Sequence, residues 1–168
     1  MGANLILKGD RIDLGFLHPP IRDRDGSLNL QFLREDFILV LLPASHPLAE
    51  QEKVSIASLA DKPIIIYPRE KGPILYEQFL QLSQTAGFVP KIVQEVEMTQ
   101  TRLGLVAAGV GISFILSSSQ NLTMKGVVCR SLLEEFPKLE LAIAWQKNNS
   151  SRVLQQFIKL ARKPERDP

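Results

Sequence analysis

Short apolar runs alternate along this chain with segments of helical periodicity, and this rhythm limits its fold more than any other feature. Strands are predicted at residues 11–17, 37–42, 63–67, 91–95, 111–115, 126–130 and 139–145. Runs that are apolar throughout, such as residues 37–42, are typical of strands covered on both faces. Strands separated by helices predict an α/β fold with largely parallel strands.

Three helices are predicted from apolar side chains that recur at helical spacing. The first carries its apolar residues at Leu75, Phe79, Leu82 and Ala86. It ends at Gly87, and the second helix opens at Thr99 or Thr101 and ends at Gly109. The third begins near Ser150 or Ser151. It is expected to bury Val153, Leu154, Phe157, Ile158 and Ala161.

Two apolar strands that connect one part of the fold to another divide the chain. Residues 37–43 lead out of an amino-terminal part, and residues 139–145 lead back before the last helix. We therefore expect residues 1–43 and 139–168 to form one lobe, and residues 44–138 to form a second, inserted lobe joined to it by two hinge strands. Ligands of open α/β sheets bind at the carboxyl ends of strands and in crevices between domains, so a ligand is expected between the lobes.

The composition is that of a soluble globular protein. Of the 168 residues, 45% are hydrophobic and 23% are charged, and 20 basic against 18 acidic residues leave a net charge of +2. Nucleic-acid surfaces need concentrated basic side chains. The nearest cluster is Lys159, Arg162, Lys163 and Arg166, where a favourable interaction with the carboxyl end of a last helix is the simpler expectation. Without a long apolar run or a signal sequence, the chain is predicted to be cytoplasmic and to bind no membrane.

The sequence offers no catalytic or metal-binding pattern. The single cysteine, Cys129, excludes an internal disulfide, and the two histidines, His18 and His46, are not spaced as metal ligands. Gly109 and Gly111 fit part of a dinucleotide-binding loop, but position 114 is Phe where a third glycine is required. We therefore expect no enzyme activity, no cofactor and no metal.

Three phrases of the sequence resemble the LysR-type transcriptional regulators. They are Arg11-Ile12-Asp13-Leu14-Gly15-Phe16 with Gly9 before it, Arg34-Glu35-Asp36 leading through residues 37–43 into Ala44-Ser45-His46-Pro47-Leu48-Ala49, and residues 105–113. Their order and spacing are similar to those of the family's effector-binding domain. Ile66-Tyr67-Pro68 and residues 104–113 look most similar to the subgroup that responds to intermediates of aromatic degradation, such as benzoate and muconate.

The resemblance implies a two-lobed, periplasmic-binding-protein-like fold of type 2 that binds a small effector, often a carboxylate, in the cleft between its lobes and so modulates transcription. It also implies homo-oligomers, and contact with DNA only through a helix-turn-helix domain that this chain does not contain. The elements that open the first lobe in the family are missing as well, so that lobe is expected to be incomplete. The alternative is that the chain serves mainly as an oligomerisation module without competent ligand binding.

By the same resemblance, the effector site takes residues from both lobes. Helix amino-terminal ends attract anions through free backbone N–H groups and the helix dipole. The matching positions in the second lobe are the loop of Pro73, Ile74 and Leu75 before the first helix, and Thr99 with Gln100 at the start of the next helix. Those in the first lobe are Leu17, His18 and Leu141. As alternatives, Thr99 is an ordinary helix cap, His18 a surface histidine and Leu141 a core residue.

Arg34 and His46 complete the candidate residues. In the aromatic-responsive subgroup, an arginine at the position of Arg34 serves an additional effector pocket within the first lobe. The preferred interpretation here is structural, with Arg34 paired to a nearby carboxylate such as Glu35 or Asp36. His46 follows the connecting strand at residues 37–43 and is expected to pack or to cap the next segment.

Overall fold

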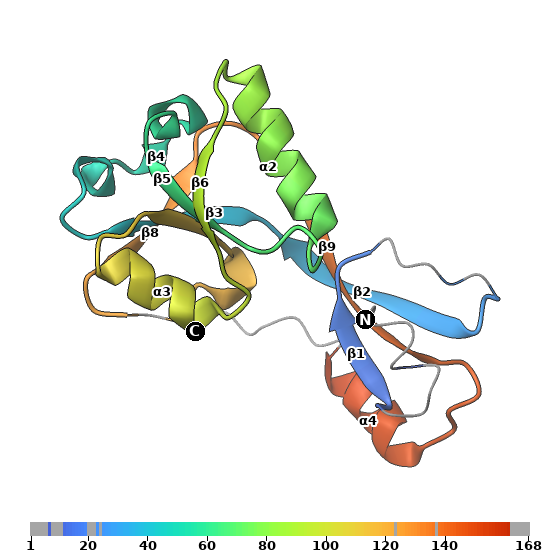
Figure 1. The fold of residues 1–168 in the computed structure, drawn as a ribbon. Helices are drawn as coiled ribbons and strands as arrows, with labels where there is room; N and C mark the ends of the chain where they lie inside the picture. Colours follow the sequence, from blue (N-terminus) through green and yellow to red (C-terminus); the bar gives the residue numbers. More distant parts are fainter. Residues whose placement is uncertain are drawn as a thin grey trace. The chain divides into compact units, whose positions relative to one another are not determined.

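The computed structural model describes residues 7, 12–19, 23, 25–122, 124–136 and 138–161. The chain divides into two compact units (Figure 1). The first comprises Met1–Asp36 and Lys138–Pro168, and the second comprises Phe37–Pro137. The boundaries differ from the predicted ones, which fell after residues 43 and 138. The difference at the first boundary arises because residues 38–43 pair with two strands of the second unit.

The second unit is built on a mixed six-stranded sheet. Its strands are β3 (Ile38–Pro43), β4 (Lys53–Val54), β5 (Pro63–Ile66), β6 (Lys91–Glu95), β7 (Ile112–Leu116) and β8 (Val127–Leu132), in the spatial order β4-β8-β3-β7-β5-β6. β5 runs parallel to β6 and β7, and β4 runs parallel to β8. β3 is antiparallel to both of its neighbours. The prediction of largely parallel strands is therefore wrong for β3, which runs against the strands that the helices connect. It is also wrong for the strands of the first unit, which pair antiparallel.

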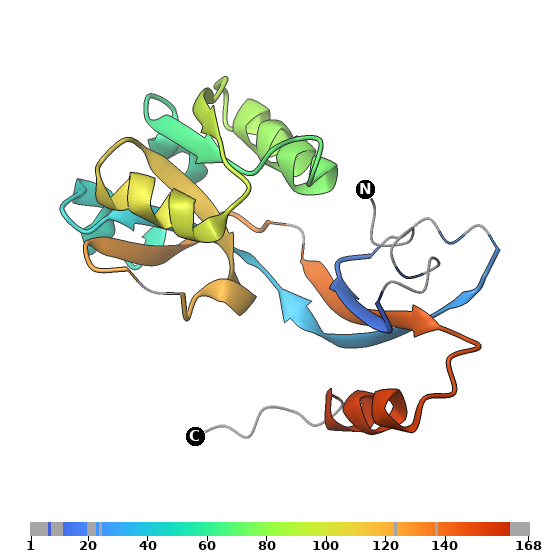
Figure 2. The same cartoon turned by 60° about the horizontal axis from the view of Figure 1, so that its bottom comes forward.

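Two helices cover opposite faces of this sheet. α2 (Pro73–Thr85) follows β5, and α3 (Thr99–Ala107) follows β6. Figure 2 shows α3 lying along the sheet, where it packs on Leu41 of β3. Neighbouring residues of a strand point to opposite faces. Phe114 of β7 therefore points away from α3, and its ring lies 4.6 Å from the ring of Phe79 on α2.

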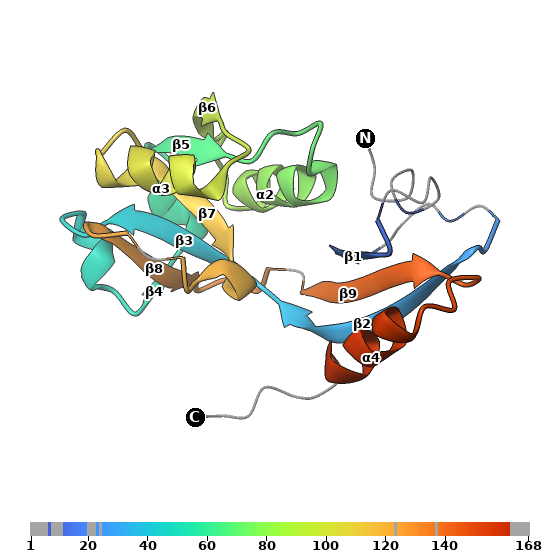
Figure 3. The ribbon, with the colours of Figure 1, turned by 90° about the horizontal axis from the view of Figure 1, so that it is seen from below.

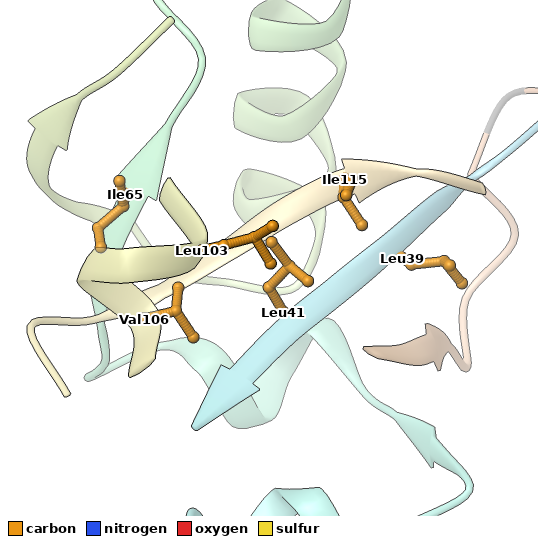
Figure 4. Close-up of a cluster of buried hydrophobic side chains, with 6 residues drawn as sticks. All are labelled: Leu39, Leu41, Ile65, Leu103, Val106 and Ile115. Carbon is orange, nitrogen blue, oxygen red and sulfur yellow. The ribbon is translucent and has the colours of Figure 1, made fainter. Parts of the chain in front are cut away.

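The core beneath α3 is shown in Figure 4. Leu103 and Val106 project from α3 toward Leu41 on the central strand. The buried cluster comprises Leu39, Leu41, Ile65, Leu103, Val106 and Ile115. Its members come from three neighbouring strands and one helix, so burial of this apolar surface fixes α3 on the sheet.

The helix ends follow the predicted signals. Gly87 after α2 and Gly109 after α3 adopt φ angles of 84° and 73°, a region that favours glycine. Before the last helix, α4 (Arg152–Ala161), Ser151 Oγ accepts a hydrogen bond from Leu154 N at 3.4 Å. Side-chain capping of this kind satisfies one of the free N–H groups of the first turn.

His46 caps a short helix, as predicted. Its Nδ1 accepts a hydrogen bond from Leu48 N at 3.2 Å at the start of the 3₁₀ helix η1 (Pro47–Glu50). Burial and the positive charge of Lys62 lower the pKa of His46. The neutral ring that this favours has the lone pair that the cap requires.

The first unit contains a three-stranded antiparallel sheet and one helix (Figure 3). β1 (Leu14–Leu17), β9 (Leu139–Gln146) and β2 (Leu28–Asp36) lie side by side with β9 in the centre, and α4 packs on one face. That face buries Ile143, Trp145, Leu154 and Ile158. The opposite face buries Leu7, Leu17, Leu28, Ala142 and Ala144.

β2 is the long strand that the apolar runs did not predict. Its apolar residues Leu28, Leu30 and Phe32 alternate with Asn29 and Gln31, which is the two-residue period of a strand, although only Leu28 of the three is buried. A search for continuous apolar runs passes over such a strand.

α4 buries fewer residues than predicted. Leu154 and Ile158 are buried, but Val153 is 76% exposed and Phe157 is 46% exposed, so the prediction is wrong for these two residues. The apolar stripe of the helix is wider than its contact with the sheet. The ring of Phe157 meets the ring of Phe16 edge-on, with centroids 6.4 Å apart.

Some candidate residues lie outside the part of the chain that the structure describes. They are Gly9, Arg11, Arg162, Lys163 and Arg166. Within the described part, no helix combines the length and the hydropathy needed to span a membrane.

Candidate functional site

The amino-terminal end of α2 has no side-chain cap. Gly72 precedes the helix and Pro73 is its first residue, so neither offers a side chain that could accept a hydrogen bond from the first turn. Backbone N–H groups of a first helical turn have no partner within the helix. Pro73 is exposed and Leu75 is partly buried, and the two lie in this first turn rather than in a loop before the helix, where they were predicted. The backbone of Ile74 lies between them.

α3 also begins without a side-chain cap. Met98 occupies the capping position, and its side chain makes no capping hydrogen bond. The interpretation of Thr99 as the helix cap is therefore wrong, because Thr99 is already the first helical residue. Thr99 is partly buried and Gln100 is exposed. Because neither helix has a side-chain cap, both helix starts offer unsatisfied N–H groups.

Arg102 lies one turn into α3 and is buried, with only 7% of its surface exposed. Its Nη1 donates to the carbonyl oxygen of Phe114 at 2.5 Å, and its Nη2 donates to Thr99 Oγ1 at 3.1 Å. Its Nε is buried and has no hydrogen-bond partner among the described residues. Burial lowers the pKa of Arg102, and the nearby Tyr67 opposes this effect. The side chain stays charged, because arginine does not lose its proton in proteins.

Tyr67 connects the two helix starts. Its ring lies under the guanidinium of Arg102, whose Cζ is 5.7 Å from the ring centroid. The same ring packs against Gly72, where an added Cβ would stand 2.8 Å from the Cδ1 atom of Tyr67. Glycine at this position therefore allows Tyr67 to contact the start of α2 while it supports the cation at the start of α3.

The nearby carboxylates are paired with other groups. Glu95 accepts a hydrogen bond from the Tyr76 hydroxyl at 3.3 Å, and Glu97 pairs with Lys71 at 3.5 Å. Among the residues that the structure describes, Arg102 has no carboxylate within salt-bridge distance. Two helix starts, a hydroxyl and a cation with no carboxylate partner among the described residues thus gather at the carboxyl ends of the parallel strands β5 and β6. Ligands of open α/β sheets bind at such strand ends. This arrangement is suited to an anion.

The predicted residues of the first unit have different environments. Leu17 is buried in the apolar cluster of the sheet, and Leu141 on β9 is partly buried opposite Arg34 of β2. His18 Nδ1 donates to the carbonyl oxygen of Glu140 at 3.0 Å, and its Nε2 lies 3.8 Å from the fully buried carboxylate of Asp36.

Arg34 is exposed on β2. Its neighbour Glu35 forms an exposed ion pair with Lys138, with 2.6 Å between Oε2 and Nζ.

Sequence reasoning missed Arg102 and the role of Tyr67. Arg102 follows Thr99 by three residues and precedes Val106 by four, so it lies on the buried face of α3. That position was the available signal, because a charge on a buried helix face needs a partner.

A separate open pocket of the second unit is lined by Glu50, Glu52, Cys129, Arg130 and neighbouring residues, and none of the predicted effector residues lines it. No group of three or more His, Cys, Asp or Glu side chains suited to a metal occurs in the described ranges.

Residues 5–164 match the LysR substrate binding domain family. The HTH-type transcriptional regulator AlsR of Bacillus subtilis is 36% identical over 156 residues, which cover 93% of this chain and 51% of that protein. CatR of Pseudomonas putida, also an HTH-type transcriptional regulator, is 31% identical over 154 residues, which cover 92% of this chain and 52% of that protein. The chain spans about half the length of these curated relatives.

Solved structures of the same family share the fold. The effector binding domain of BenM with its effector benzoate matches with a TM-score of 0.72 at 28% identity, over 98% of this chain and 79% of that one. Full-length BenM matches with a TM-score of 0.75 at 30% identity, over 96% of this chain and 55% of that one. The α/β fold is therefore periplasmic-binding-protein-like of type 2. The chain belongs to the LysR substrate binding domain family, as an effector-binding domain of transcriptional regulators and not an enzyme.

Proposed function

We propose that this domain binds a small carboxylate-bearing effector at the amino-terminal ends of α2 and α3. The observation that carries the proposal is the buried guanidinium of Arg102, which stands beside two uncapped helix starts and has no carboxylate partner among the residues that the structure describes. Pro73, Ile74, Leu75, Thr99 and Gln100 belong to these two starts. Helix N–H groups and a fixed cation together favour a carboxylate over a neutral ligand.

We further propose that the effector is an aromatic acid or a related dicarboxylate. BenM, whose effector is named as benzoate, supports this class, although the likeness in sequence is 28%. Tyr67 supports it from this chain, because a partly buried aromatic ring at the site offers an apolar surface to a ring-bearing acid.

In the intact regulator, effector binding would modulate transcription. A ligand does so only if it binds one conformation of the protein more tightly than another. Contact with DNA is assigned to a helix-turn-helix domain, as the names of the HTH-type relatives suggest. This chain alone is expected to give no sequence-specific band in a gel-shift assay, and such a band would contradict the assignment.

Thermal unfolding with a panel of aromatic acids and dicarboxylates tests the proposed site. At ten times its Kd, a ligand of the folded state raises the midpoint by about 3–6 °C for a domain of this size. Thr99→Ala is expected to abolish most of this shift. Thr85→Ala is the matched control, because that hydroxyl caps a carbonyl at the far end of α2. The site is wrong if no acid shifts the wild type, or if Thr99→Ala leaves a shift intact.

Leu17, His18 and Leu141 stay predicted effector residues, and Arg34 stays a predicted secondary site. His18→Gln and Arg34→Ala separate these roles in the same assay. Loss of the effector shift in His18→Gln, with the fold retained, would support a binding role. An unchanged shift in Arg34→Ala would leave that residue its structural role.

The alternative function as an oligomerisation module is favoured by the exposed apolar side chains of α4. Val153, Phe157 and Leu160 are exposed there, and a second copy of the chain is the occupant we propose for this face, in line with the homo-oligomer expected for the family. Sedimentation of the wild type and of Val153→Glu would test it. Association that survives this substitution would exclude the α4 face.

A further inference from the structure

We propose that Arg102 is a positioning residue that holds the Thr99 hydroxyl as a hydrogen-bond donor and supplies the counter-charge for one carboxylate of the effector. The inference rests on the proposed function and adds which charge and which hydrogen-bonding group of a ligand the site selects. A ligand must present an anionic hydrogen-bond acceptor at the start of α3, whereas a neutral or cationic group at that point is disfavoured.

The contact with Arg102 determines whether the Thr99 hydroxyl donates a hydrogen bond to a ligand or accepts one from it. A threonine hydroxyl has one proton to donate and two lone pairs to accept with, and a guanidinium has donors only. The bond from Arg102 Nη2 to Thr99 Oγ1, 3.1 Å long, therefore uses a lone pair of the hydroxyl and leaves its proton. No described residue accepts that proton. The second lone pair could still accept from a ligand, but the positive charge of Arg102 beside it disfavours a donor group, so an acceptor is the preferred partner of Thr99.

Arg102 is held in place from three sides. Its Nη1 donates to the carbonyl oxygen of Phe114 on β7, its Nη2 reaches Thr99, and its guanidinium stands over the ring of Tyr67. A planar guanidinium can serve two acceptors at once, whereas the single nitrogen of a lysine is a compact point charge. The geometry is thus specific to arginine and orders the hydroxyl before any ligand arrives.

An anion bound near Arg102 would offset the cost of its buried charge. A buried cation without a partner is costly, and an opposite charge nearby offsets that cost. Of the two carboxylates on the segment before α3, Glu95 is bonded to Tyr76 and Glu97 to Lys71. Three of the five guanidinium N–H groups of Arg102, including Nε–H, have no acceptor in the described part of the chain. A carboxylate bound to Thr99 would bring the missing negative charge.

Benzoate and its neutral isostere benzamide separate charge from shape in a calorimetric titration of the 168-residue chain. Arg102→Met is expected to weaken benzoate binding about tenfold or more and benzamide binding only severalfold, because benzamide loses the positioned hydroxyl but no counter-charge. Thr99→Val, which removes the hydroxyl and keeps the shape, is expected to weaken both ligands, because both offer an acceptor oxygen. Thr99→Ser should restore both. Lys53→Met removes one positive charge at the opposite edge of the sheet and should leave both affinities unchanged.

The outcomes distinguish this inference from the proposed function. If Thr99→Val weakens benzoate binding but Arg102→Met affects both ligands equally or neither, the proposed site stands and the role of Arg102 is overturned. If the wild type binds neither ligand, the proposal of an aromatic acid falls and this inference falls with it. Should Arg102→Met fail to fold, Arg102→Lys decides. It is expected to keep the preference for benzoate and to weaken both ligands severalfold, and wild-type affinities for both would overturn the inference.

Discussion

Glu134 holds the start of a short helix through Ser55, although 79 residues separate the two in the sequence. Ser55 Oγ donates to Glu134 Oε1 at 2.6 Å, and the backbone N–H of Ile56 donates to Oε2 at 2.8 Å. The helix is η2 (Ile56–Leu59), which buries Ile56 and Leu59 in the second unit. One carboxylate thus ties the end of β8 to the segment that follows β4.

Glu134→Gln is expected to destabilise the second unit by about 1–2 kcal/mol, because a charged acceptor of two hydrogen bonds becomes a neutral one. Glu135→Gln, one residue further along and exposed, should change the free energy of unfolding by less than about 0.5 kcal/mol. Urea unfolding followed by circular dichroism measures both. Equal effects of the two substitutions would contradict the role of Glu134.

The contribution of Glu134 should depend on pH. Burial raises the pKa of this carboxyl, but the hydrogen bonds from Ser55 and Ile56 lower it by more. The pKa in the folded protein is therefore below the unfolded value of 4.5. A group whose pKa is lowered by folding stabilises the protein above its unfolded pKa, and this stability is lost as the pH falls through the folded pKa. The difference between wild type and Glu134→Gln should be full at pH 7 and shrink below pH 4.5. A difference that grows on acidification would reverse the sign and refute the argument.

Gly111 and Gly104 should respond to alanine in opposite directions. A Cβ at Gly111 would stand 2.5 Å from the carbonyl oxygen of Pro63, where β7 approaches β5, whereas a Cβ at Gly104 meets nothing within 4 Å. Gly111→Ala is expected to cost about 1–3 kcal/mol through forced backbone shifts. Gly104→Ala lies inside α3 and should stabilise by about 0.5–1 kcal/mol. Thermal midpoints of the two variants check the signs, and a neutral Gly111→Ala would contradict the close packing of β5 and β7.

Leu41→Ala is expected to destabilise the second unit by about 2–5 kcal/mol, because Leu41 has 0% exposure at the centre of the cluster under α3. Leu133→Ala removes the same atoms from a side chain that is 64% exposed and should cost much less. Denaturant midpoints measured on both variants test the difference. Similar losses would mean that the cluster does not carry the stability of this unit.

Local sequence signals predicted the elements that local chemistry determines. β6 was predicted with its observed bounds, and Gly87 and Gly109 marked helix ends because positive φ angles favour glycine whatever surrounds them. β2 was not predicted, because its burial depends on β9, which pairs with it from more than a hundred residues away. Val153 and Phe157 were assigned to the core because periodicity shows which face of a helix is apolar but not how much of that face its neighbours cover.

The candidate site was predicted in part. Sequence reasoning found the start of α3 at Thr99, but it placed Pro73 in a loop before α2, whereas Pro73 is the first residue of that helix. It missed the contact between Arg102 and Thr99, because a charged residue in an amphipathic helix is ordinarily placed on the solvent side. Tyr67 became part of the site only when the fold brought its ring between Gly72 and Arg102.

Cys129 should react slowly with thiol reagents in the folded protein. Its side chain is partly buried, because it packs against the cluster under α3 on one side and lines the open pocket on the other; burial raises its pKa, an effect that the positive charge of Arg130 opposes. Because the thiolate is the reactive form, both limited access and the raised pKa slow the reaction. We expect modification by dithiobis(nitrobenzoate) at pH 8 to be at least about tenfold slower in buffer than in denaturant. Leu41 is the residue paired with Cys129 across β3 and β8, so Leu41→Ala should accelerate the reaction and Leu133→Ala should not. Equal rates in the folded and unfolded chains would mean that packing against the cluster does not shield the thiol.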